Sequence, residues 1–127
     1  MTTTPGRKFL DRHLSQMSAG KIDEMVDNDY KEDAVLIAFF NGFETPAPIT
    51  AKGRDGLKKF FHDYMKVIGN IDVQTMDLTE DFNGNEGYIL FQYTFNFNQS
   101  LIEAGDAWTM KDGQIVDHFS FWVSDKS

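Results

Sequence analysis

One long segment in the second half of the chain alternates between two kinds of side chain. Over residues 87–98, the odd positions after Gly87 carry large apolar or aromatic side chains, namely Ile89, Phe91, Tyr93, Phe95 and Phe97. Successive side chains of a strand point to opposite faces of a sheet, so this pattern predicts a strand with one apolar face. Less regular segments of the same kind cover residues 71–82, 101–110 and 114–123. Such segments in a row predict a large antiparallel sheet.

The first half of the chain has the spacing of helices instead. Residues 7–17 and 22–26 carry apolar side chains at helical intervals, which predicts two helices. Gly53 opens a third helix and Gly69 ends it. The apolar stripe of this third helix consists of Leu57, Phe60, Phe61, Tyr64, Met65 and Ile68. Such a stripe is typical of a helix that buries one face.

A short strand and a loop are expected between the second and third helices. Residues 34–40 predict a buried strand, Asn41-Gly42 predicts a turn, and the proline-containing residues 43–48 predict a loop or an edge segment. Helices that are segregated from strands predict the α+β class. The length predicts a single domain over residues 1–127, with a flexible tail at residues 1–6.

Charge and composition exclude several classes of function. With 20 acidic against 12 basic residues the formal net charge is −8, so we expect no binding to nucleic acid or to anionic membranes. The absence of cysteine excludes disulfides and thiolate nucleophiles, and the three histidines have no metal-ligand spacing. Without a glycine-rich nucleotide loop, we expect no cofactor. No apolar leader is seen and no apolar run approaches the ~20 residues that span a bilayer, so we expect a cytoplasmic protein.

An acidic cluster lies across the second helix and the strand that follows it. It consists of Asp23, Glu24, Asp27, Asp29, Glu32 and Asp33. These residues lack the alternate spacing and the glycine of a calcium-binding loop. We therefore expect them to form a solvated helix face and a polar lead-in to the strand.

A carboxylate stands on an apolar strand face near the C-terminus. Residues 101–123 read as a hairpin around Lys111-Asp112-Gly113, and Asp106 shares a face with Ile102, Ala104, Trp108 and Met110. A charge on a buried face is costly unless it is paired, hydrogen-bonded or neutralised. Asp106 is therefore either the centre of a site or a charge that protects the edge of a sheet.

The turn allows two pairings of the hairpin strands. A two-residue Asp-Gly loop places Asp106 opposite Phe119, whereas a three-residue loop places it opposite His118. We prefer the second register, because it sets two polar side chains opposite each other and gathers Trp108 and Trp122 on their face. The alternative to a site is a purely structural cross-strand pair.

Three stretches of the chain resemble the NTF2-like superfamily, and within it the SnoaL-like group. The first stretch, residues 18–26 followed by residues 30–35, resembles the family's opening helix and strand. The second, residues 52–61, resembles its third helix, and the third, residues 106–116, resembles its Asp-x-Trp hairpin. The resemblance implies a cone, in which a strongly curved, mainly antiparallel sheet wraps around the N-terminal helices and encloses a pocket. It also implies a homodimer formed through the outer face of the sheet.

Within this superfamily, the chain also distantly resembles ketosteroid isomerase. Asp106 falls at that enzyme's neutral, hydrogen-bonding aspartic acid, whereas His13 and Phe61 each fall where it has a tyrosine. Its catalytic base would fall near Ala38, and alanine cannot accept a proton. The resemblance therefore argues against steroid isomerisation by that mechanism. SnoaL-type cyclases, which use a hairpin aspartate with nearby histidines, are more similar to Asp106, His118 and His13.

Two functions are consistent with these residues. The first is cofactor-free acid–base catalysis (an isomerase, cyclase or dehydratase) on a small hydrophobic or aromatic molecule, with Asp106, His118 and His13 as catalytic groups. The second is a non-catalytic ligand-binding or dimerisation module. In either, the expected ligand-binding residues are Tyr30, Phe61, Phe91, Tyr93, Trp108, Ser120 and Trp122. A third possibility, a protein-binding adaptor, has no distinctive sequence support.

Overall fold

A computed structural model describes residues 4–39, 47–69 and 71–124 of the chain. Its elements, in chain order, are α1 (Pro5–Ser18), α2 (Ile22–Asp29), β1 (Tyr30–Phe39), β2 (Ile49–Lys52), α3 (Gly53–Val67), β3 (Asp72–Asn83), β4 (Glu86–Phe97), β5 (Ser100–Lys111) and β6 (Gln114–Ser124). The expected α+β class is confirmed. The expected turn at Asn41-Gly42 and most of the 43–48 segment lie outside the described residues. No helix among those described is long and apolar enough to cross a bilayer.

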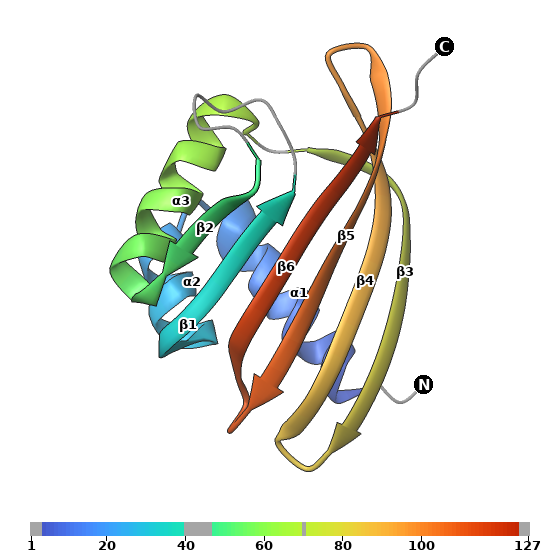
Figure 1. Cartoon of the computed structure of the whole chain (residues 1–127). Helices are drawn as coiled ribbons and strands as arrows, with labels where there is room; N and C mark the ends of the chain where they lie inside the picture. Colours follow the sequence, from blue (N-terminus) through green and yellow to red (C-terminus); the bar gives the residue numbers. More distant parts are fainter. Residues whose placement is uncertain (1–3, 40–46, 70, 125–127) are drawn as a thin grey trace.

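The strands form one sheet in the order β2-β1-β6-β5-β4-β3. All neighbours are antiparallel except β1 and β6, which run parallel. The helices lie on one side of this sheet, and the long strands β3 to β6 bend around α1 (Figure 1). The apolar face predicted for residues 87–98 is the buried face of β4, and it packs toward the helices. The core therefore lies between the helices and the concave side of the sheet.

The first strand begins earlier than its apolar pattern predicts. β1 starts at Tyr30, and its pairing with β6 is irregular between Tyr30 and Val35. The polar residues of this irregular stretch concealed the start of the strand, because they break the apolar run. After the undescribed segment, β2 pairs with the outer edge of β1.

The first helix also begins earlier than expected, because its N-terminus is held from the sheet. Thr4 caps α1, and Pro5 and Gly6 are its first residues, so the expected tail does not extend to residue 6. The Glu80 carboxylate on β3 accepts from the Thr4 hydroxyl at 2.5 Å and from the Gly6 amide at 3.1 Å. The first turn of α1 has no acidic residue of its own. Glu80 supplies the negative charge that a helix N-terminus favours.

The hairpin between β5 and β6 follows neither of the two registers considered from sequence. Lys111 pairs with Gln114, as a two-residue Asp-Gly loop requires, but the pairing shifts by one residue just beyond the turn. Asp106 consequently lies opposite Ser120, and the expected pairings with His118 or Phe119 are both wrong. A β-bulge inserts one extra residue into a strand and changes its facing. The bulge lets the chain keep the two-residue Asp-Gly turn and still place the apolar residues of β5 and β6 on the same face of the sheet.

Candidate functional site

A cavity of about 180 Å³ lies between the helices and the concave face of the sheet. Most of its wall is apolar and is formed by Leu14, Met17, Leu36, Phe60, Phe61, Met65, Ile71, Val73, Met76, Phe91 and Trp108. Its polar lining residues are His13, Ser18, Tyr64, Tyr93, Asp106, His118 and Ser120. Ser18 and Val73 are exposed, so the cavity opens near the end of α1 and the start of β3. Asp106 and His118 are buried and lie at the inner end.

Four buried side chains form one hydrogen-bonded series at this inner end. The Tyr30 hydroxyl lies 2.8 Å from His118 Nδ1, and His118 Nε2 lies 2.6 Å from Asp106 Oδ1. The Tyr93 hydroxyl donates to Asp106 Oδ2 at 3.0 Å. Asp106 and His118 therefore do meet, but diagonally across β5 and β6. The carboxylate has a partner on each oxygen and still faces the cavity.

Burial determines the protonation of the groups around Asp106. Desolvation raises the pKa of Tyr30 and of Tyr93 well above the ordinary tyrosine value, with the nearby Asp106 charge adding to both shifts. Desolvation also lowers the pKa of His118, although its hydrogen bond to Asp106 opposes that shift. Both phenols thus remain donors and His118 is neutral near pH 7. With Tyr30 donating to Nδ1, His118 carries its proton on Nε2 and donates it to Asp106.

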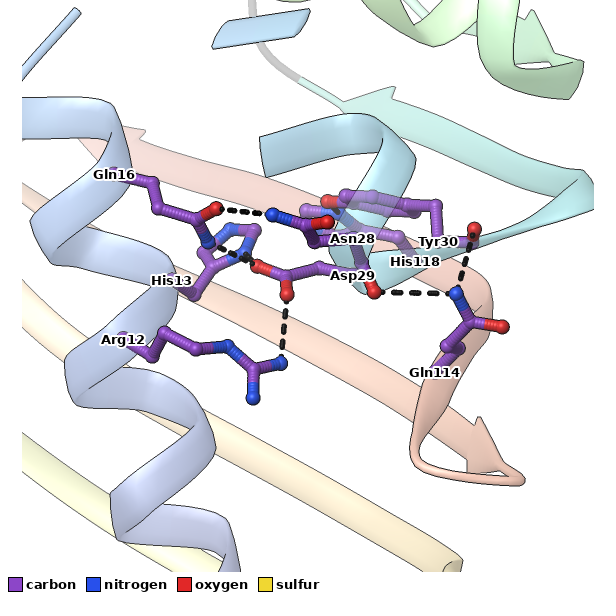
Figure 2. Close-up of polar contacts among 8 residues, drawn as sticks. All are labelled: Arg12, His13, Gln16, Asn28, Asp29, Tyr30, Gln114 and His118. Atoms are coloured by element: carbon purple, nitrogen blue, oxygen red, sulfur yellow. Dashed lines mark hydrogen bonds and ion pairs between the residues drawn. The ribbon is translucent and has the colours of Figure 1, made fainter. Parts of the chain in front are cut away.

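A second carboxylate–histidine pair lies beside the first. His13 is 2 % exposed and Asp29 is 0 % exposed. Asp29 Oδ2 lies 3.0 Å from His13 Nδ1 and also accepts from the Gln16 amide, while Oδ1 accepts from the Arg12 guanidinium at 2.7 Å. Figure 2 shows Asp29 reaching from α2 toward these three side chains of α1. The expectation of a solvated acidic cluster is wrong for Asp29.

The junction between α2 and β1 is fixed from several sides. The Gln16 carbonyl accepts from the Asn28 amide, and the Gln114 amide donates to the backbone oxygens of Asn28 and Tyr30 (Figure 2). The Arg54 side chain donates to the same Tyr30 oxygen. Contacts from α1, α3 and β6 thus hold Asp29 and Tyr30 in place.

Most of the predicted site residues gather around the cavity. Its lining includes the three predicted catalytic residues and five predicted ligand-binding residues, namely Phe61, Phe91, Tyr93, Trp108 and Ser120. Tyr30 and Trp122 are not part of the lining. The Tyr30 phenol lies behind His118, and Trp122 packs against Phe95 and Phe97. The cavity is therefore not bounded by both tryptophans, as the sequence suggested.

Sequence reasoning missed several contributors to the cavity. Leu36 of β1 pairs with His118 and lines the wall, close to the expected base position at Ala38, and neither residue can accept a proton. Met17, Met65 and Met76 also line the cavity and are more exposed than its inner end. Strand and helix periodicity could place these residues inward, but could not show which of them border an open space.

The described residues contain no evident metal site. No group of three or more potential ligand side chains comes together in the part of the chain that the structure describes. The indole Nε1 of Trp108 is buried and has no hydrogen-bond acceptor among those residues. The ring of Trp108 contacts the rings of both His13 and His118, with centroid distances of 4.8 Å and 5.6 Å. The two histidines therefore share one aromatic neighbour.

Comparison with known proteins identifies the fold. No protein-family model matches the chain, and no curated protein matches it either. An NTF2-like protein of unknown function from Burkholderia xenovorans is similar in structure, with a TM-score of 0.68 and 16% identity, over 97% of this chain and 86% of that one. A protein with a ketosteroid isomerase-like fold from Catenulispora acidiphila, solved with trimethylamine, gives a TM-score of 0.64 and 12% identity, over 93% and 85%.

An enzyme is also among the similar structures. SalBIII, an epoxide hydrolase/cyclase-like enzyme of pyran ring formation in the polyether salinomycin, gives a TM-score of 0.60 and 15% identity, over 93% of this chain and 90% of that one. Identities this low establish the fold alone. The chain has the NTF2-like fold, which confirms the architecture expected from the sequence.

Proposed function

We propose that this protein binds a small, largely apolar molecule in its cavity and catalyses a cofactor-free proton transfer in it. The observation that carries the proposal is the buried series Tyr30–His118–Asp106–Tyr93, whose carboxylate borders an otherwise apolar cavity. Convergent polar groups in an apolar pocket are typical of small-molecule sites. The similarity in fold to a cyclase-like enzyme supports this class of reaction.

Asp106 is the proposed proton acceptor and donor. His118 and Tyr93 each donate one hydrogen bond to it, one to each carboxylate oxygen, and so hold the carboxylate in position. A carboxylate oxygen has more than one lone pair, so Asp106 can still take a proton from the bound molecule. Returning that proton to another atom gives an isomerisation, and delivering it to a leaving hydroxyl gives a dehydration.

The cavity volume limits the size of the ligand. An apolar cavity of about 150 Å³ holds benzene. At about 180 Å³, this cavity suits a single ring with a short substituent. A four-ring steroid is much larger, which agrees with the missing base near Ala38.

Binding can be tested through the methionines of the wall. p-Cresol is added to protein labelled with ¹³C at the methionine methyl groups. We expect NMR shifts at Met17, Met65 and Met76, which line the cavity. Met25, a buried core residue outside it, is the internal control. Shifts of equal size at Met25 and the lining methionines, or no shifts at all, would contradict binding in the cavity.

We also propose a homodimer through the outer face of the sheet, whether or not the protein is an enzyme. Phe39, Phe119 and Phe121 are 49%, 43% and 36% exposed. They share the face away from the helices, and Phe121 lies beside Phe39 on β1 and opposite Gly105 on β5. A side chain at Gly105 would collide with the Phe121 ring, so this ring lies against the sheet and the patch is flat. A flat apolar patch of this kind suits a second copy of itself.

Light scattering after gel filtration tests the dimer. The unaltered chain is expected at twice the monomer mass, and Phe119→Ser at the monomer mass, because a hydroxyl replaces an exposed ring of the patch. Phe119→Leu keeps the patch apolar and should remain dimeric. A monomeric unaltered chain, or a dimeric Phe119→Ser, would refute this interface.

A further inference from the structure

We infer that the Asp29–His13 pair is a second acid–base centre of the cavity, and that it selects ligands carrying a hydroxyl group. This inference rests on the proposed function, because it assumes that the cavity binds a small molecule. The pair is well buried, yet the ring of His13 forms part of the cavity wall. The two ring nitrogens of His13 therefore have different surroundings: Nδ1 contacts Asp29, and the rest of the ring borders the cavity.

The contacts of Asp29 define which nitrogen of His13 carries the proton. The Arg12 guanidinium is permanently charged, and the Gln16 amide nitrogen must donate because its carbonyl accepts from Asn28. Asp29 therefore faces donors and accepts from all of them, including His13 Nδ1–H at 3.0 Å. In the neutral imidazole this leaves the lone pair on Nε2.

No residue in the described part of the chain is a hydrogen-bond partner of His13 Nε2. An acceptor that faces a mostly apolar cavity is costly to leave unpaired. The group that satisfies it must donate a hydrogen bond, and a ligand hydroxyl does so while a carbonyl or ether oxygen does not. His13 thus discriminates between hydroxylated rings and unsubstituted rings of the same shape.

The same arrangement makes His13 a base. The hydroxyl proton of the ligand can pass to Nε2, and the electron pair of the broken O–H bond remains on the oxygen. The resulting imidazolium keeps its Nδ1–H on Asp29, whose position stabilises the new charge. Return of the proton restores the neutral pair. Asp106 and His118 line the same cavity as His13, so two proton-transfer groups serve one cavity.

The tautomer can be read directly in the unaltered protein. ¹⁵N-labelled histidine is observed by NMR at about pH 8, above the usual histidine pKa of ~6.5. We expect His13 Nε2 to resonate as an unprotonated nitrogen and to shift when p-cresol binds. p-Xylene, which has the same shape without the donor, should leave it unchanged. A protonated Nε2, or a p-cresol shift at His118 in place of His13, would overturn the inference.

A variant that replaces the Asp29 carboxylate by an uncharged amide supplies a second test. In Asp29→Asn the amide can donate to Nδ1, which moves the His13 proton to Nε2. Affinity for p-cresol should fall about tenfold, equal to about 1.4 kcal/mol, while affinity for benzaldehyde, an acceptor, should rise. Asp27→Asn, on the exposed side of α2, is the matched control and should change neither.

The outcomes separate this inference from the proposed function. If p-cresol shifts the wall methionines but not His13, the cavity binds ligands and the role of His13 is wrong. If p-cresol shifts neither His13 nor the wall methionines, the proposal that the cavity binds a ligand is wrong. Should Asp29→Asn not fold, the wild-type tautomer measurement still decides the question.

Discussion

Proton exchange at the methylene group of phenylacetone in D₂O is expected to fall by at least ~10² when Asp106 is replaced by Asn, since a positioned general base contributes about that much. Asparagine keeps the shape of the side chain but cannot take up a proton. Exchange is followed by the loss of the methylene signal in the proton NMR spectrum, after subtraction of the rate in buffer.

The fold of the Asp106→Asn variant must be intact for this comparison to count. Its circular dichroism and the methionine shifts caused by p-cresol should match those of the unaltered chain. Asp117→Asn, at an exposed position of β6, is the matched control and should exchange at the original rate. Equal rates for Asp106→Asn and the unaltered chain would remove Asp106 from the mechanism. Exchange no faster than in buffer would count against catalysis and leave ligand binding untouched.

Trp108→Ala is expected to lower the free energy of unfolding by about 3–5 kcal/mol, the usual cost of truncating a buried aromatic residue. The side chain is 2 % exposed and its ring contacts Phe9 and Phe91 at centroid distances of 5.5 Å and 5.8 Å. A loss of this size is a large part of the ~5–15 kcal/mol by which domains are stable. Urea unfolding followed by circular dichroism measures it.

Two further substitutions show whether burial is the cause. Tyr88→Ala truncates an aromatic side chain that is 62% exposed and should stay within about 0.5 kcal/mol of the unaltered chain. Trp108→Phe keeps a ring in place and loses no hydrogen bond, because the indole N–H has no acceptor in the described part of the chain. Trp108→Phe should therefore lower the free energy of unfolding by less than Trp108→Ala does. Equal losses for Trp108→Ala and Tyr88→Ala would show that Trp108 does not support the core.

The contact between Asp106 and His118 could be predicted, but its geometry could not. A carboxylate on an apolar face requires a polar partner, and the strand pattern offered His118. Two turn lengths are compatible with the sequence, and the register inferred from each assumes that both strands continue without a bulge. The observed bulge combines the turn of one register with the facing of the other. Local turn preference does not reveal such a bulge, because the advantage comes from packing across the whole sheet.

The role of Asp29 was accessible from the sequence and was missed. Ile22, Met25, Val26 and Asp29 occupy the same face of α2, at the spacing of a buried stripe, and all of them are buried. This is the reasoning that singled out Asp106 on its strand. The neighbouring acidic residues concealed the burial of Asp29, because a cluster of charged side chains is usually solvated. The cavity, in contrast, depends on the curvature of the sheet, which side-chain periodicity does not encode.

Asp29 and Tyr30 are consecutive residues, yet they hold different histidines, His13 on α1 and His118 on β6. One residue removed from α2 would rotate everything after it by about 100°, since a helix has 3.6 residues per turn. The contact of Asp29 with His13 and the contact of Tyr30 with His118 would then be lost together. The register of α2 therefore positions the partners of both buried histidines at once.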